Sequence, residues 1–186
     1  MSKNGILYYI MGPSGAGKDT LLDAVRREKP EGVIFSHRYI TRSRDTGREA
    51  HVPLSAEEFA LRRDFGLFAL AWEAHGTWYC IGLEIDCWLD KGLSVVVNGS
   101  RAALDQAQER YPGLEAVYVR ADPDLLRRRL LQRGYETREQ IENRLARNSD
   151  YPPPRTRLTI IDNSGALKQS VERMLDLLEE VPKVIK

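Results

Sequence analysis

The chain has 186 residues, of which 42% are hydrophobic, so it is long enough to bury one full core. Its 28 Lys and Arg against 27 Asp and Glu give a net charge of +1, which excludes a chain-wide basic surface or an acidic tail and allows only a local anion site. The spacing of its two cysteines, Cys80 and Cys87, fits neither a disulfide framework nor a C-x-x-C metal pair.

The apolar runs predict a layered α/β fold. A short buried strand is expected at residues 6–11, followed by a glycine-rich turn and a helical pattern at residues 20–27. Further strands are expected at residues 93–97, 116–119 and 158–161, and helices at residues 83–90, 101–110, 123–147 and 167–178. Because parallel strands need crossover helices and bury both faces, this alternation predicts a three-layer parallel sheet flanked by helices. The first strand is too short to cross a membrane, and we expect a cytoplasmic protein.

The turn after the first strand carries a phosphate-binding pattern. Its residues are Gly12, Pro13, Ser14, Gly15, Ala16, Gly17 and Lys18, which match G-x-x-x-x-G-K. Glycines let backbone N–H groups point inward at phosphate oxygens, and the start of the next helix adds its dipole. Lys18 would bring a full charge to the β- and γ-phosphates. The strand, turn and helix together predict a P-loop NTPase that binds ATP.

The two positions after the lysine are Asp19 and Thr20, whereas the pattern has a Ser or Thr there whose hydroxyl binds magnesium. A carboxylate is a hard oxygen ligand suited to Mg²⁺, so Asp19 is a candidate residue of the metal shell. It also repels a triphosphate unless a cation is bound. The alternative is a simple acidic residue at a helix start. The expected cofactors are ATP and Mg²⁺, with Thr20 as a further ATP-binding residue.

Segments along nearly the whole chain resemble the guanylate kinases in the same order. They are the glycine-rich turn, Thr41-Arg42, Gly47, residues 54–59, Trp78-Tyr79, Arg129-Leu130, Arg133-Gly134, Glu136-Thr137, Arg144-Leu145 and residues 161–164. The resemblance implies one kinase domain over residues 1–186, with a core of residues 1–34, 82–122 and 155–186, a substrate-binding lobe of residues 35–81 and a lid of residues 123–154. It also implies that Arg129, Arg133 and Arg144 surround the moving phosphoryl group and that Asn163 lies beside the adenine. Surface salt bridges and a plain turn are the alternatives.

The departures from that family fall where guanine would be read. Leu70 and Ile81 stand at the places of a base-binding glutamate and a base-contacting serine, and neither can hydrogen-bond a base. His51 falls near the place of a phosphate-binding tyrosine, and residues 97–101, Val-Asn-Gly-Ser-Arg, replace an acidic D-x-D-x-x-G. This altered set, with residues 37–42, resembles the ribose 1,5-bisphosphate phosphokinases, the guanylate-kinase relatives of phosphonate catabolism.

That resemblance implies transfer of the γ-phosphoryl group of ATP to the 1-phosphate of ribose 1,5-bisphosphate, giving 5-phospho-α-D-ribose 1-diphosphate (PRPP) and ADP. Since the acceptor is already an anionic phosphate oxygen, no general base is required. Catalysis then consists of positioning and charge neutralisation by Lys18 and the lid arginines. The expected acceptor-binding residues are Arg38, Arg42, His51, Tyr79, Asn98, Ser100 and Arg101.

Two other classes of function stay open. A guanylate kinase, or another nucleotide or small-molecule P-loop kinase, would use the same loop with a different acceptor. A protein-binding scaffold of the guanylate-kinase type is the non-enzyme alternative, but such scaffolds commonly lose the phosphate loop, which is intact here. The expected partners are ATP and a phosphorylated ribose, with no nucleic acid and no membrane, for a monomer or a homodimer.

Overall fold

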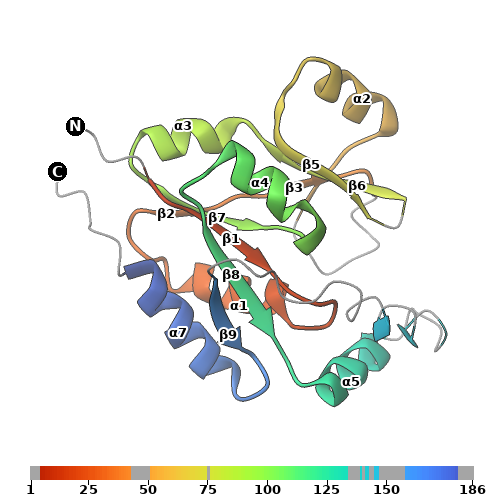
Figure 1. Ribbon diagram of the computed structural model, residues 1–186, viewed down its shortest axis with the longest axis vertical. Coiled ribbons are helices and arrows are strands. Elements are labelled where there is room, and N and C mark those ends of the chain that lie inside the picture. Colours follow the sequence, from red (N-terminus) through yellow and green to blue (C-terminus); the bar gives the residue numbers. More distant parts are fainter. Residues whose placement is uncertain are drawn as a thin grey trace.

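A five-stranded parallel sheet lies at the centre of the protein (Figure 1). The structure is a computed structural model that describes residues 5–42, 51–74, 76–133, 139, 141–142, 145–146 and 158–179. The strand order is β2-β7-β1-β8-β9, and every neighbouring pair is parallel. The strands are β1 (Leu7–Met11), β2 (Val33–Phe35), β7 (Ser94–Asn98), β8 (Glu115–Arg120) and β9 (Thr159–Asp162). The loop after β1 therefore leaves the sheet from its middle strand, at the edge where the carboxyl ends of parallel strands meet.

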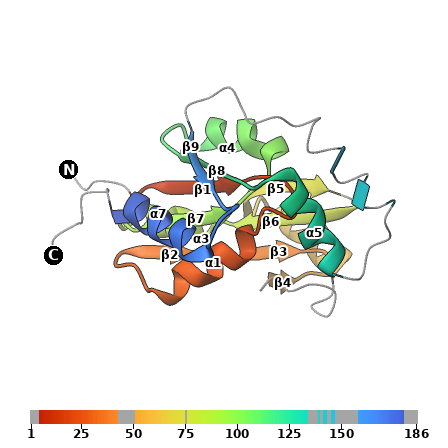
Figure 2. The ribbon, with the colours of Figure 1, turned by 90° about the horizontal axis from the view of Figure 1, so that it is seen from below.

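Helices cover both faces of this sheet (Figure 2). On one face lie α1 (Lys18–Arg27) and α7 (Leu167–Glu179), and on the other lie α3 (Glu84–Asp90), the 3₁₀ turn η2 (Arg101–Ala103) and α4 (Leu104–Arg110). All of β1 is buried because its side chains alternate between the two apolar cores. Tyr8 and Ile10 pack with α1 and α7, whereas Leu7, Tyr9 and Met11 pack on the α3 and α4 side.

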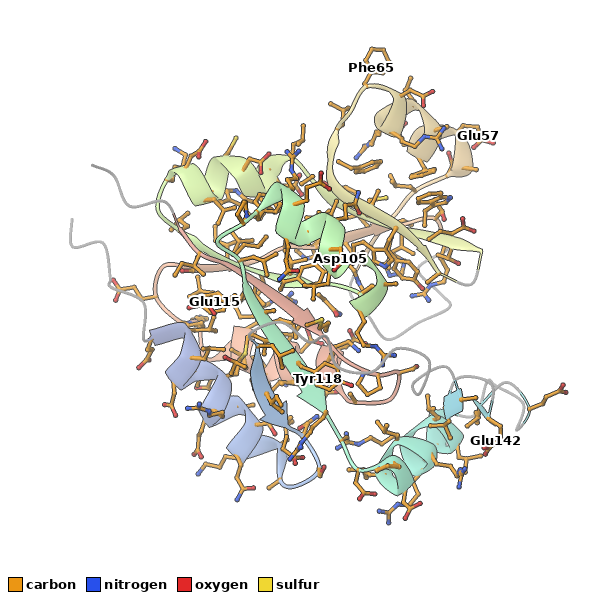
Figure 3. The ribbon with its side chains drawn as sticks, viewed as in Figure 1. Glu57, Phe65, Asp105, Glu115, Tyr118 and Glu142 are labelled. Carbon is orange, nitrogen blue, oxygen red and sulfur yellow. The ribbon has the colours of Figure 1, made fainter. Side chains whose placement is uncertain are left out.

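A second, four-stranded sheet stands beside the main one. Its order is β4-β3-β6-β5. Its elements are β3 (Arg38–Ile40), β4 (His51–Pro53), α2 (Ala56–Asp64), β5 (Phe68–Ala74) and β6 (Thr77–Gly82). The Ser55 hydroxyl starts α2 by accepting a hydrogen bond from the Glu58 amide at 3.1 Å. Phe65 ends that helix and projects into solvent with 74% of its surface exposed (Figure 3).

The expected α/β fold is confirmed, with differences in detail. The main sheet holds a fifth strand, β2, that the sequence did not predict, because three half-buried residues are too few to show a period. The expected helix at residues 123–147 is described as α5 (Pro123–Arg133), and most residues beyond it lie outside the described ranges. The division into core, lobe and lid stays a prediction. None of the helices in the described ranges combines the length and the apolar composition that crossing a membrane requires.

Candidate phosphate-transfer site

The turn between β1 and α1 has a backbone that only glycine can follow. Gly12 and Gly17 have φ angles of +153° and +85°. A Cβ at Gly12 would lie 2.1 Å from the Val119 carbonyl oxygen, and one at Gly17 would lie 2.6 Å from the Asn163 side-chain nitrogen. Helix α1 begins at Lys18, directly after this turn. A glycine-rich turn that leads directly into a helix N-terminus is the arrangement in which backbone amides can bind a polyphosphate.

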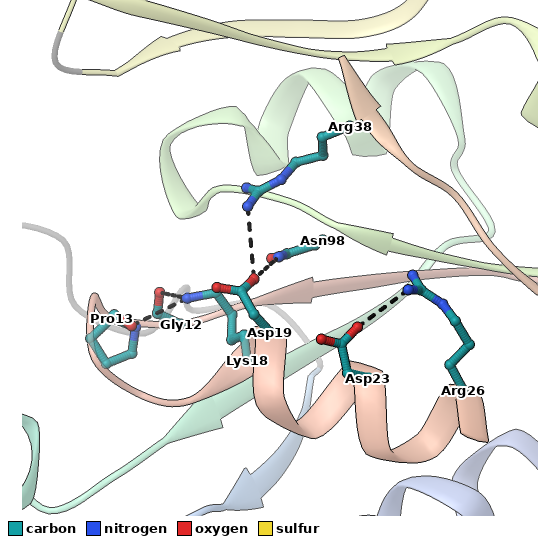
Figure 4. A network of polar contacts seen from close by, with 8 residues as sticks. All are labelled: Gly12, Pro13, Lys18, Asp19, Asp23, Arg26, Arg38 and Asn98. Atoms are coloured by element: carbon teal, nitrogen blue, oxygen red, sulfur yellow. Dashed lines mark hydrogen bonds and ion pairs between the residues drawn. The ribbon is translucent and has the colours of Figure 1, made fainter. Parts of the chain in front are cut away.

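Lys18 folds back over this turn (Figure 4). Its Nζ donates to the Gly12 oxygen at 2.9 Å and to the Pro13 oxygen at 3.2 Å. These bonds hold the ammonium group above the loop rather than in open solvent. A cation is thus held beside the glycine-rich turn.

Arg129 and Asn163 both donate hydrogen bonds to one carbonyl oxygen of the loop, that of Ala16. The Asn163 Nδ2 donates to the Ala16 oxygen at 2.8 Å, and the Arg129 Nη1 donates to the same oxygen at 3.2 Å. The Arg129 Nη2 also donates to the Asn163 carbonyl at 3.0 Å. Desolvation by burial lowers the pKa of the Arg129 guanidinium from its usual value. Two residues expected at the nucleotide site, 34 positions apart, are therefore brought together at the loop.

Asp19 connects the start of α1 to strands β7 and β3 (Figure 4). Its Oδ1 accepts a hydrogen bond from the Asn98 Nδ2 at 2.7 Å and lies 3.8 Å from the Arg38 Nη2. Asn98 ends β7 and is buried, and its Oδ1 has no hydrogen-bond partner in the part of the chain that the structure describes. Asp19 therefore makes tertiary contacts with two residues of the set expected to bind the acceptor, in addition to its place at the start of α1.

Arg38 lies over an aromatic pair of the second sheet. Its guanidinium carbon is 5.2 Å from the centroid of the Tyr79 ring. Tyr79 is in turn stacked on Trp72, with centroids 5.9 Å apart and ring planes 8° apart. Cation–π contact holds the face of a guanidinium and leaves its N–H edge for anions. The contact of Trp72 with Tyr79 follows from the pairing of β5 with β6, in which the two residues are register partners.

The loop after β7 is held against β1 by Tyr9. The Tyr9 hydroxyl donates to the Ser100 carbonyl and accepts from the Ser100 amide, both at 2.9 Å. Burial raises the pKa of Tyr9 to about 12, so its phenol stays neutral. Arg101 begins the 3₁₀ turn just beyond. The sequence did not indicate Tyr9 as a site residue, although a glycine directly after a buried strand, Gly99, was a signal for close packing there.

Arg42 and His51 are in contact beside β3. His51 is the register partner of Arg38 in the β3–β4 pair, is 5% exposed, and has its Nε2 3.2 Å from the Arg42 carbonyl oxygen. The Nε of Arg42 is buried without a hydrogen-bond partner among the described residues. A buried guanidinium N–H with nothing to donate to favours an anion site there. The Arg133 side chain and all of Arg144 lie outside the described residues.

The positions where a base would be read are apolar and closed. Leu70 and Ile81 face each other across β5 and β6, with 1% and 0% of their surfaces exposed. Both belong to the core cluster that includes Trp72. Neither residue presents a hydrogen-bonding group to a ligand.

Asp19 is also the carboxylate that a magnesium ion would meet. The described residues hold no group of three or more His, Cys, Asp or Glu side chains that could cage a metal. Mg²⁺ is commonly held by one or two carboxylates together with substrate phosphates and water, rather than by such a cage. A single, partly exposed carboxylate at the start of α1, next to the phosphate loop, fits that requirement.

The central strand, the loop and α1 define a P-loop nucleotide-binding protein with a kinase-like site. An AAA domain family model matches residues 9–149. A guanylate kinase from Anaplasma phagocytophilum has a similar fold, with a TM-score of 0.71 at 17% identity over 96% of this chain and 87% of that one.

Closer relatives define the particular family. The chain is 49% identical to ribose 1,5-bisphosphate phosphokinase PhnN of Chromobacterium violaceum over 93% of both chains. It is 50% identical to the protein of that name from Burkholderia pseudomallei over 93% of this chain and 95% of the relative. The chain belongs to the ribose 1,5-bisphosphate phosphokinase family and is a phosphotransferase. The resemblance found in the sequence is thereby confirmed.

Proposed function

We propose that the protein uses Mg·ATP to phosphorylate the 1-phosphate of ribose 1,5-bisphosphate, giving PRPP and ADP. The observation that carries the proposal is the buried Leu70–Ile81 pair, which puts apolar side chains at the two positions that the sequence aligned with base-reading residues. An acceptor without a base but with two phosphates suits the guanidinium groups of Arg38 and Arg42 instead. Relatives that are about half identical carry the corresponding name.

On the donor side, the amides of the turn and Lys18 would hold the polyphosphate of ATP. Arg129 would neutralise charge on the moving group together with Arg133 and Arg144. Asn163 would shape the nucleotide pocket from the Ala16 side. When bound at Asp19, Mg²⁺ supplies additional charge neutralisation for the phosphates.

On the acceptor side, Arg38 and Arg42 would hold the two phosphates, helped by the polar groups of the set named from the sequence: His51, Tyr79, Asn98, Ser100 and Arg101. An oxygen of the 1-phosphate forms the new bond to the γ-phosphorus. The bond from that phosphorus to the bridging oxygen of ADP breaks, and ADP leaves with the electron pair. The attacking oxygen is an anion at neutral pH, so these side chains position it and need not remove a proton.

The proposal includes the organisation expected from the sequence. Residues 35–81 would form the acceptor lobe and residues 123–154 a lid that excludes water during transfer. The protein would act in the cytoplasm as a monomer or homodimer.

Product analysis tests this function. The protein is incubated with ATP, Mg²⁺ and ribose 1,5-bisphosphate, and ³¹P NMR then follows the phosphates at the sugar's first carbon. We expect a diphosphate there and no comparable turnover of GMP. Lys18→Met should lower kcat by roughly a hundredfold or more, whereas Arg127→Met, at an exposed arginine paired with Glu142, should leave turnover unchanged. Preferential phosphorylation of GMP, or no diphosphate on the sugar, would overturn the proposal.

A further inference from the structure

One carboxylate oxygen connects the nucleotide side of the site to the acceptor side. The Oδ1 of Asp19 lies on α1 and meets Asn98 from β7 and Arg38 from β3 (Figure 4). The Arg38 side chain is 12% exposed and that of Asp19 is 42% exposed. All three residues line one surface pocket between these elements. A ligand that engages Asp19 therefore changes the surroundings of Arg38 directly.

Arg38 does not depend on Asp19 for its place. The Tyr79 ring supports its guanidinium from below, and Trp72 supports Tyr79. A planar guanidinium held by one face keeps several N–H donors on its edge, and these can exchange one anion for another without moving the group. Tyr79 and Trp72 are thus positioning residues for Arg38.

A magnesium ion and Arg38 would compete for the negative charge of Asp19. A divalent cation on its carboxylate cancels the negative charge that Arg38 now faces at 3.8 Å. The guanidinium is then left next to a neutralised partner, where it attracts an incoming phosphate more strongly. The converse holds too, because a carboxylate already shared with Arg38 and Asn98 is a weaker ligand for the metal.

We propose that Asp19 couples the two ligand sites. Its carboxylate faces Arg38, and when a nucleotide-bound Mg²⁺ engages that carboxylate, the Arg38 guanidinium pairs with a phosphate of the acceptor instead. Nucleotide and acceptor then bind with positive cooperativity, which by thermodynamic linkage is reciprocal. The coupling delays tight binding of the acceptor until Mg·ATP is in place. The identity of the acceptor in this statement depends on the proposed function, whereas the competition at Asp19 does not.

The first test needs no acceptor. Calorimetry measures the affinity for the non-hydrolysable analogue AMP-PNP with Mg²⁺ and with EDTA. Arg38→Met should increase the Mg²⁺-dependent gain in affinity about threefold or more, because the metal no longer competes with a guanidinium. Without the proposed competition, removing the positive charge of Arg38 near a polyphosphate would weaken AMP-PNP binding. An increased gain in affinity is therefore specific to the competition at Asp19.

Two control variants accompany that measurement. Arg38→Lys keeps a cation beside Asp19 and should behave like the wild type. Arg26→Met removes an arginine that lies on α1, the helix of Asp19, and pairs with Asp23 at 3.2 Å. This variant should leave the Mg²⁺-dependent gain in affinity unchanged. A gain that is unchanged or reduced in Arg38→Met would overturn the inference.

The second test measures ribose 1,5-bisphosphate binding with and without Mg·AMP-PNP. In the wild type, Mg·AMP-PNP should tighten acceptor binding about fivefold or more. Asp19→Asn should bind the acceptor without nucleotide as tightly as the wild type does with it, and should show no further gain. Asp23→Asn makes the same charge change one turn along α1 and should keep the wild-type gain. In the Arg38→Met background, Asp19→Asn should no longer tighten acceptor binding.

The outcomes separate the two proposals. A wild type that binds ribose 1,5-bisphosphate without cooperativity, or an Asp19→Asn variant whose acceptor affinity stays at the nucleotide-free wild-type value, contradicts the coupling. A protein that binds no ribose 1,5-bisphosphate even with Mg·AMP-PNP contradicts the proposed function. The first test then decides the coupling by itself. If Arg38→Met does not fold, Asp19→Asn and its Asp23→Asn control decide it.

Discussion

Gly99→Ala should destabilise the protein by overlap with a ring that cannot move. The backbone of Gly99 lies outside the left-handed region, so the cost comes from contact alone. An added Cβ would lie 2.1 Å from the Tyr9 Cζ and 2.4 Å from its Cε2. Carbon atoms in contact are about 3.5–4.0 Å apart, so ring and loop would have to separate by roughly 1.5 Å.

The Tyr9 ring has no room for that displacement. It is 0% exposed, and its hydroxyl is bonded to both the amide and the carbonyl of Ser100 at 2.9 Å. Overpacking costs about 1–3 kcal/mol, and each disrupted hydrogen bond adds about 1 kcal/mol, so we expect a loss of about 3 kcal/mol. For a chain of this size that corresponds to a fall in Tm of about 6–12 °C.

Urea unfolding followed by circular dichroism measures this loss. Gly113→Ala is the matched control, because among the described residues no atom beyond its two chain neighbours lies within 4 Å of the position its Cβ would take. It should change the free energy of unfolding by no more than about 0.5 kcal/mol. In a Tyr9→Leu background the Gly99→Ala change should cost less than about 1 kcal/mol, since the ring is gone. A cost below 1 kcal/mol in the wild type, or an equal cost in both backgrounds, would refute the reasoning.

Three further outcomes are expected. Ser55→Ala should lower the free energy of unfolding by about 1 kcal/mol because it removes the N-cap of α2, whereas Ser55→Thr, which retains a hydroxyl, should cost less in the same urea assay. The exposed Cys87 should react with a thiol reagent at pH 8 and the buried Cys80 only after unfolding; two fast-reacting thiols would contradict this. Burial raises the pKa of Cys80 and of Tyr9 to about 12, above their ordinary values of 9.0 and 10.0, so both favour folding in their neutral forms. Their contribution to the free energy of unfolding should be complete below pH 9 and fall as the pH rises toward about 12. Urea unfolding midpoints measured over this pH range should therefore fall, and midpoints that rise with pH would contradict the prediction.

The local pattern of apolar residues was sufficient to predict most strands of the central sheet. The strands at β1, β7, β8 and β9 are short apolar runs bounded by turn residues, and each was predicted to within two residues of its ends. The G-x-x-x-x-G-K turn could be recognised because its requirements, positive φ and close backbone approach, act on consecutive residues. Lys18 and the glycines could be identified from the sequence for the same reason, because they lie next to one another along the chain.

The second sheet could not be predicted in this way. Strand β3 pairs with a segment far away in the sequence, as in Tyr39 with Cys80, and three-residue strands such as β3 and β4 have no period of their own. The longer strands β5 and β6 pair as a local hairpin. Leu70 and Ile81 were expected to be apolar at the acceptor side, but only the register of β5 against β6 shows that they face each other in the core.

The amino-acid sequence by itself determined the phosphate loop, the class of fold and the family, because these depend on residue types at fixed short spacings. The tertiary structure decided which residues Asp19 contacts. The sequence favoured a metal-shell residue over a helix-start acid, but it could not show the contacts with Arg38 and with Asn98, the latter 79 positions away. An ion pair or hydrogen bond depends on distances of a few ångströms between atoms, and such distances exist only once the two sheets have packed together.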